Sequence, residues 1–239
     1  MLLVSLPQLC DTTSMPSFIC QAILFDLDGV LVDSTPVVAR IWREWAIEHE
    51  LDPEYVIHYT HGQRTIDSVQ DLTPHLDPQA ETDKIERLEI EDSDGLRALP
   101  GAKELLASLP SDRYTIVTSG TRQLAITRLQ AVGLPVPACM ITANEVSQGK
   151  PNPEPYLAGA ALLGFPPANC LVFEDAPNGI HSAKAAGMRV IAMPTTYKRE
   201  NLMQADLIIL SLESVRARSD HSSPEALRVE IAPADGLGE

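Results

Sequence analysis

The sequence is poor in cysteine and in positive charge. Four cysteines occur among 239 residues and none forms a C-x-x-C pair. The sequence therefore predicts neither a zinc site nor a disulfide framework. Scattered thiols fit a reducing compartment, and we expect a cytoplasmic protein. Only 18 lysines and arginines stand against 33 acidic residues, a net charge of -15. The negative electrostatic field of a chain with this charge repels phosphate backbones and anionic lipid, so we expect no binding to nucleic acid or to a membrane.

Long hydrophobic runs are absent as well, since none reaches the roughly 20 residues that cross a bilayer. The first ten residues are apolar, but no lysine or arginine precedes them. We therefore interpret residues 1–20 as an N-terminal extension rather than a signal peptide, with Met1 and Met15 as alternative starts. Residues 216–239 are polar and rich in turn formers. We interpret them as a tail, in which the segment LRVEI adds an edge strand.

Short apolar runs and helical patterns alternate along most of the chain. Ala22–Leu27 predicts a buried strand, and after residue 100 predicted helices and strands follow one another. Later strands are predicted at Tyr114–Thr118, Cys139–Thr142, Cys170–Phe173, Arg189–Ala192 and Leu207–Leu210. This order predicts an α/β fold, a Rossmann-like doubly wound parallel sheet. Residues 35–99 show only helical spacing and predict an inserted α-helical cap domain on a core of residues 21–34 and 100–215. We expect a monomer.

Polar residues follow four of the predicted strands. They are Asp26 and Asp28, then Thr118, Ser119 and Gly120, then Lys150, and finally Glu174 with Asp175. Ligands bind at the carboxyl ends of the strands in an open parallel sheet, so these residues predict one polar site. Converging carboxylates repel one another unless a hard cation neutralises them, and Mg²⁺ is the natural choice beside a phosphate. Lysine and hydroxyl donors suit the charged oxygens of a phosphoryl group.

These residues are sufficient for a two-step phosphoryl transfer. Asp26, at the strand end, is placed to attack phosphorus and form an aspartyl-phosphate. Asp28 lies two residues further on and points to the same side of the chain. It is therefore a candidate to protonate the leaving alcohol and then to activate water.

Four segments resemble the four motifs of the haloacid dehalogenase-like hydrolase superfamily, in order and at the expected strand ends. They are DLDGVLVDS at residues 26–34, IVTSG at 116–120, GKPNPEPY at 149–156 and VFEDAPNGI at 172–180. The resemblance implies that Asp26 is the nucleophile and a Mg²⁺ ligand. It also implies that Asp28 is the acid/base and binds the metal through its backbone carbonyl. Asp175 would be the second metal carboxylate, with Glu174 as a nearer or water-mediated partner.

The same resemblance implies the phosphate-binding groups. Lys150 matches the lysine that balances charge on the nucleophile and the phosphate. Thr118 matches the phosphate-binding hydroxyl, with Ser119 and Gly120 supplying backbone contacts. The register is open by one residue, so Ser119 is the alternative hydroxyl. In this superfamily a helical cap closes over the site and excludes water.

The cap segment THGQRTID, residues 60–67, looks similar to sugar phosphatases and glycerol-3-phosphatases. It implies that His61 and Arg64 bind the substrate, and we add Arg122 as a candidate on the core side. The expected activity is Mg²⁺-dependent hydrolysis of a small sugar or polyol phosphate. β-Phosphoglucomutases share this layout, but Val38 stands where we align their cap-hinge histidine, which favours hydrolysis over a mutase. A non-catalytic protein that binds a phosphorylated metabolite is the remaining alternative.

Overall fold

A five-stranded parallel sheet forms the centre of the protein. The structure, a computed structural model, describes residues 15–220 and 226–232. Residues 1–14, on which the choice between Met1 and Met15 as the start depends, lie outside the described residues. The strand order is β5 (Tyr114–Ile116), β2 (Ala22–Phe25), β6 (Cys170–Glu174), β7 (Arg189–Ala192) and β8 (Leu207–Ile208). All four pairings are parallel, which confirms the predicted sheet. Within the described ranges, no helix is both long and apolar enough to cross a membrane.

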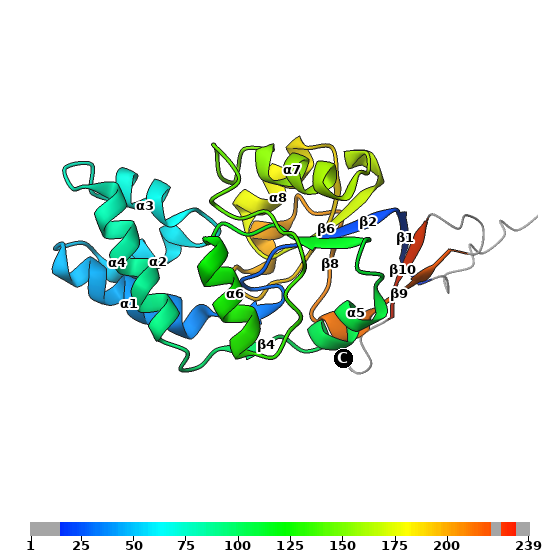
Figure 1. Cartoon of the computed structure of the whole chain (residues 1–239), viewed down its shortest axis with the longest axis horizontal. Helices are drawn as coiled ribbons and strands as arrows, with labels where there is room; N and C mark the ends of the chain where they lie inside the picture. Colours follow the sequence, from blue (N-terminus) through cyan, green and yellow to red (C-terminus); the bar gives the residue numbers. More distant parts are fainter. Residues whose placement is uncertain (1–14, 221–225, 233–239) are drawn as a thin grey trace, which may run out of the picture.

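Helices cover both faces of this sheet. Helices α5 (Ala102–Ser108) and α6 (Arg122–Ala131) lie on one face, and α7 (Glu154–Leu163) and α8 (Pro177–Ala185) lie on the other (Figure 1). Strand β2 is buried on both sides because its side chains alternate between two hydrophobic clusters. Ile23 and Phe25 pack towards α5 and α6, while Ala22 and Leu24 pack towards α7 and α8. This explains its continuous apolar sequence.

Four helices inserted after the first core strand form the cap. They are α1 (Thr35–Glu48), α2 (Pro53–Thr60), α3 (Thr65–Leu72) and α4 (Pro78–Glu91), and they lie together at one end of the molecule (Figure 1). Trp42, Trp45 and Ile85 are buried in a hydrophobic cluster of the cap's own. At its base, β3 (Val32–Asp33) and β4 (Arg97–Ala98) pair in antiparallel fashion and join the cap to the core.

A third sheet joins distant parts of the chain. Strand β10 (Leu227–Ile231) pairs on one side with β1 (Ser17–Cys20) and on the other with β9 (Val215–Ser219). LRVEI is therefore a strand, but it is the middle strand of a separate sheet rather than an edge strand. Strand β1 thus lies within the predicted N-terminal extension, and β9 spans the predicted boundary between the core and the tail. The pairing connects segments about 200 residues apart, which local sequence patterns do not reveal. Short 3₁₀ turns at Pro167–Asn169, Arg199–Leu202 and Leu212–Ser214 complete the described elements.

The predicted strand Cys139–Thr142 is wrong. Ile141 forms a single bridge with Val117 at the open edge of β5. The backbone N–H of Thr142 donates instead to the Glu145 carboxylate at 2.8 Å, and the Thr142 hydroxyl contacts the same carboxylate. The next N–H that faces β5, that of Ala143, donates to the backbone oxygen of Gly120 at 2.9 Å, in the loop beyond the strand. The segment therefore leaves the ladder after one pair.

Candidate active site

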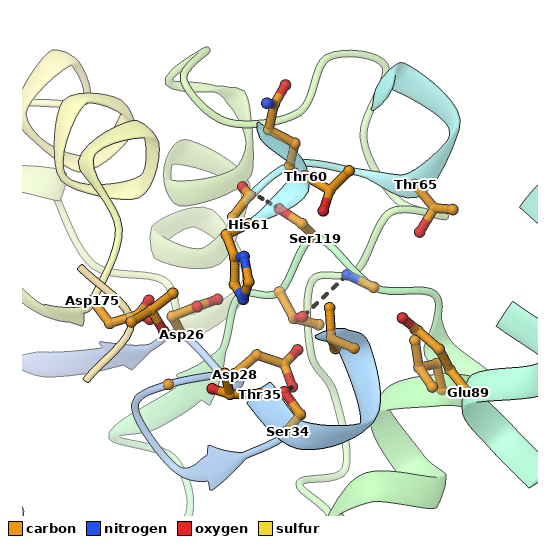
Figure 2. A pocket seen from close by; sticks show the side chains of 18 of the residues that line it. Asp26, Asp28, Ser34, Thr35, Thr60, His61, Thr65, Glu89, Ser119 and Asp175 are labelled. Atoms are coloured by element: carbon orange, nitrogen blue, oxygen red, sulfur yellow. Dashed lines mark hydrogen bonds between the residues drawn. The ribbon is translucent and has the colours of Figure 1, made fainter. Parts of the chain in front are cut away.

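Three loops at the carboxyl ends of the central strands meet beneath the cap. They bring Asp26, Asp28, Thr118 and Asp175 to the wall of one pocket. The opposite wall comes from the cap and includes His61. Asp26 and Asp175 lie side by side at one end of this pocket (Figure 2). The structure thus brings together core residues that are up to 150 positions apart in the sequence.

A buried lysine links the first and fourth motifs. Lys150 donates to Asp26 Oδ1 and to Glu174 Oε1, both at 2.7 Å. Tyr156 donates its hydroxyl to the same Glu174 oxygen at 2.8 Å. The other oxygen, Glu174 Oε2, accepts from the backbone N–H groups of Asp175 and Ala176. Glu174 therefore holds the lysine and the fourth-motif loop in place, and its side chain does not reach the pocket wall.

The charges at this end of the pocket do not balance. Burial raises the pKa of Asp26 to about 7, as do the nearby Glu174 and Asp28 carboxylates, although Lys150 acts in the opposite direction. Burial and the neighbouring Glu174 and Asp26 also raise the pKa of Asp175 well above its ordinary value. Burial alone would lower the pKa of Lys150, but Asp26 and Glu174 outweigh it and raise that pKa. The single ammonium group of Lys150 therefore compensates only part of the negative charge of three carboxylates.

This carboxylate cluster fits a hard cation. Asp26, Glu174 and Asp175 each offer an oxygen, and these oxygens lie within 4.8 Å of one another. Gly29 has φ of +80°, and a Cβ there would lie 2.0 Å from Asp175 Oδ2. Only glycine lets this loop pass so close to the carboxylate. The Asp28 side chain stands outside the cluster, as expected for a residue that would contribute its backbone carbonyl.

The second-motif loop provides two hydroxyls with different partners. Thr118 Oγ1 accepts from the backbone N–H of Gly120 at 3.1 Å, which leaves its own proton free to donate. Ser119 Oγ donates to the backbone oxygen of Gly62 in the cap at 3.0 Å. Thr118, Ser119 and Gly120 all line the pocket, as predicted. The Ser119 hydroxyl is engaged by the cap, and the Thr118 hydroxyl is available to a ligand.

His61 reaches into the pocket from the cap, with its ring pointing towards Asp26 and Asp28 (Figure 2). Its Nδ1 lies 2.5 Å from the backbone oxygen of Ile57, which only accepts, so Nδ1 carries the proton. Burial lowers the pKa of His61, which favours the neutral ring. Its Nε2 is buried and has no hydrogen-bond partner. It is therefore an acceptor for a donor on a bound ligand.

The structure does not bring Arg64 and Arg122 to the pocket wall. Arg64 pairs with Asp67 at 2.7 Å and donates to the backbone oxygen of Val146, which attaches the cap to a core loop. Arg122 pairs with Glu145 at 2.7 Å. Both guanidinium groups sit beside carboxylates close to them in the fold, and these ion pairs hold them outside the pocket.

Sequence reasoning missed two charged pocket residues, Arg128 on α6 and Glu89 on α4. Arg128 Nη1 donates to Asp28 Oδ2 at 2.8 Å, and Arg128 Nη2 donates to Glu89 Oε2 at 3.0 Å. Arg128 and Glu89 are each 4% exposed. The spacing of residues along α6 could have indicated that Arg128 is buried. Arg128 follows the buried Leu124 by four residues, which places a charge on the apolar face of the helix.

The buried Glu89 carboxylate predicts a pH-dependent contribution to stability. Burial raises the pKa of Glu89 from 4.5 to about 7, although Arg128 acts to lower it. The folded protein therefore binds the Glu89 proton more tightly than the unfolded chain does. The contribution of Glu89 to the free energy of unfolding is full below pH 4.5 and is lost as the pH rises through 7. The shift corresponds to on the order of 3 kcal/mol.

Glu89→Gln should lack this dependence. We expect the free energy of unfolding of the unsubstituted protein to fall relative to that of the variant between pH 4.5 and 8. Urea titrations across that range measure the difference in the free energy of unfolding between the two proteins. Asp26 and Asp175 titrate in both proteins, so their effect cancels in this difference. Parallel curves for the two proteins would show that Glu89 keeps an ordinary pKa.

A helical cap covers the carboxyl ends of a Rossmann-like sheet, where carboxylates and a buried lysine provide charges of the kind that stabilise a phosphoryl group. The family model of the haloacid dehalogenase-like hydrolases matches residues 20–187, more than half of the chain. The chain belongs to this family, as its four motifs predicted. It is therefore an enzyme of the hydrolase class.

Named relatives match over more than four fifths of the chain. The sequence is 43% identical to hexitol phosphatase A of Escherichia coli, over 82% of this chain and 93% of the relative. It is 38% identical to glycerol-1-phosphate phosphohydrolase 1 of Saccharomyces cerevisiae, over 86% of this chain and 88% of the relative. The crystal structure of a hydrolase from Pseudomonas syringae superposes with a TM-score of 0.72 at 29% identity, covering 80% of this chain and 94% of that one.

Proposed function

We propose that the protein is a Mg²⁺-dependent phosphatase that hydrolyses small sugar or polyol phosphates through an aspartyl-phosphate on Asp26. The observation that carries the proposal is the contact between Lys150 and Asp26 at 2.7 Å at the end of β2. It directs one carboxylate oxygen to the lysine, while Asp26 remains on the pocket wall beside Thr118. The names of the two relatives, a hexitol phosphatase and a glycerol-1-phosphate phosphohydrolase, support this substrate class.

In the first step an Asp26 oxygen attacks phosphorus and the bond to the leaving alcohol breaks. Thr118 and the ammonium group of Lys150 donate to the phosphoryl oxygens or balance their charge. Asp28 gives the leaving oxygen its proton, so the alcohol departs neutral. In the second step Asp28 takes a proton from water, whose oxygen attacks phosphorus and releases phosphate and the Asp26 carboxylate.

Mg²⁺ would be held by Asp26, Asp175 and the backbone carbonyl of Asp28. When bound, the ion supplies positive charge that neutralises these carboxylates and the phosphoryl oxygens. The raised pKa of Asp26, about 7, supports this assignment, because a nucleophilic carboxylate must be ionised to attack. Glu174 would act behind the site, through Lys150.

A panel of phosphate esters tests the proposal. We expect inorganic phosphate from sorbitol 6-phosphate, glycerol 3-phosphate and p-nitrophenyl phosphate in the presence of Mg²⁺, with turnover of roughly 1–100 s⁻¹ on the preferred substrate. β-Glucose 1-phosphate distinguishes hydrolysis from a mutase. Val38, which lines the pocket, offers no imidazole, so we expect glucose and phosphate as products.

Two results would contradict this function. Glucose 6-phosphate accumulating without free phosphate would identify a mutase. Binding of sugar phosphates without turnover of any ester, p-nitrophenyl phosphate included, would identify a binding protein. Asp26→Asn provides the blank for contaminating phosphatases in both assays.

A further inference from the structure

The charges around the pocket are concentrated at its two ends. Asp26 and Asp175 lie at one end and Glu89 at the other (Figure 2). Glu89 comes from the cap helix α4 and is one of the residues that line the pocket. Phosphate is bound at the Asp26 end under the proposed function, so Glu89 faces the leaving group.

The one cation on the described wall of this pocket already faces two carboxylates, although its Nε is buried without a hydrogen-bond partner. Arg128 directs Nη1 to Asp28 and Nη2 to Glu89, so one positive charge serves two carboxylates. Lys150 lies behind the wall, held by Asp26 and Glu174. The trio of Asp28, Arg128 and Glu89 therefore carries a net negative charge when its members are ionised.

The remaining cap side chains near the leaving group are neutral hydrogen-bonding groups. His61 presents an unpartnered Nε2 acceptor. Thr35, Thr60, Gln63 and Thr65 also line the pocket, together with the apolar Val38 and Trp42. Hydroxyl groups of an uncharged polyol match such a surface, because they both donate and accept. A carboxylate or second phosphate would meet Glu89 without a free cation to compensate it, in a largely desolvated space.

We propose that Glu89, held in place by Arg128, is a specificity-determining residue that restricts the enzyme to phosphate esters of uncharged alcohols and rejects substrates with a second anionic group. The inference rests on the proposed phosphatase function and adds the substrate class that this site accepts. Discrimination arises from repulsion of the wrong substrate as much as from binding of the right one.

Two matched substrate pairs test this inference. Glycerol 3-phosphate and 3-phosphoglycerate differ in one terminal group, CH₂OH against COO⁻, and so do sorbitol 6-phosphate and 6-phosphogluconate. We expect kcat/KM at pH 8, above the Glu89 pKa of about 7, to favour the uncharged member of each pair by roughly ten- to hundredfold. Glu89→Gln keeps the size of the side chain and an oxygen that accepts from Arg128. It should reduce the preference to a few-fold, mainly through faster turnover of the anionic member.

Glu86→Gln is the matched control. Glu86 lies one turn earlier on α4 and accepts from Thr121 at 2.7 Å, but it is not part of the pocket wall. We expect this variant to retain the preference of the unsubstituted enzyme. Equal kcat/KM within each pair for the unsubstituted enzyme, or an undiminished preference in Glu89→Gln, would overturn the inference. Turnover of p-nitrophenyl phosphate by all three proteins separates that outcome from failure of the phosphatase function, in which no ester would be hydrolysed.

Discussion

Asp26→Asn should abolish phosphate release while the protein stays folded. We expect kcat to fall by at least about 10⁴-fold on every substrate, because an amide oxygen cannot form the covalent intermediate that carries both steps. The fold should tolerate the change, since burial raises the pKa of Asp26 to about 7 and so already disfavours its charged form. Phosphate release measures the loss, and circular dichroism with a thermal melt measures the fold.

Asp33→Asn is the control for this substitution. Asp33 belongs to the same motif, but it pairs with Arg97 at 2.6 Å at the base of the cap and does not line the pocket. We expect its kcat to stay within about threefold of the unsubstituted enzyme, since a pair of this kind contributes little. Acid-quenched mass spectra should show one added phosphoryl group on the unsubstituted chain and none on Asp26→Asn. Comparable turnover by Asp26→Asn would assign the nucleophile to another residue.

Much of the core site could be predicted from the sequence because its residues follow strands directly. The apolar run before Asp26 fixes the strand, and the parallel topology then brings its carboxyl end beside those that precede Thr118 and Asp175. No further tertiary information is needed to place these side chains together. The alternation that predicts the sheet therefore also predicts the catalytic edge.

The cap residues could not be placed in the same way. The sequence predicts helices within residues 35–99, but the site depends on which helix face meets the core. Arg64 is the N-cap residue of α3, and its i,i+3 ion pair with Asp67 turns its guanidinium away from the pocket. Glu89 reaches the pocket only because α4 packs against α6, where Arg128 compensates part of the charge. The position of Glu89 depends on a pairing between distant segments, whereas that of Arg64 depends on a local ion pair and on its hydrogen bond to Val146.

Removing divalent metal should abolish activity and lower the thermal stability of the unsubstituted enzyme. Asp26, Glu174 and Asp175 place their oxygens within 4.8 Å of one another. Lys150 forms ion pairs with Asp26 and Glu174. Chelation leaves these carboxylates to repel one another, which raises the fraction of Asp26 that is protonated and unable to attack. We expect phosphate release to fall at least about 10³-fold in excess chelator and to return on addition of Mg²⁺.

The stability readout tests the carboxylate cluster independently of turnover. A cation that binds the folded protein but not the unfolded chain raises the melting temperature in proportion to the logarithm of its concentration above Kd. At 100 times Kd the gain in the free energy of unfolding is about 2.7 kcal/mol. For a chain of this length we expect a rise of roughly 5–10 °C. Asp175→Asn removes one of the two cluster carboxylates that line the pocket. The Mg²⁺-dependent shift should therefore shrink, and the Mg²⁺ concentration needed for activity should rise. Asp33→Asn should keep the full shift. Full activity in excess chelator, or an equal shift in Asp175→Asn, would show that these carboxylates do not hold the metal.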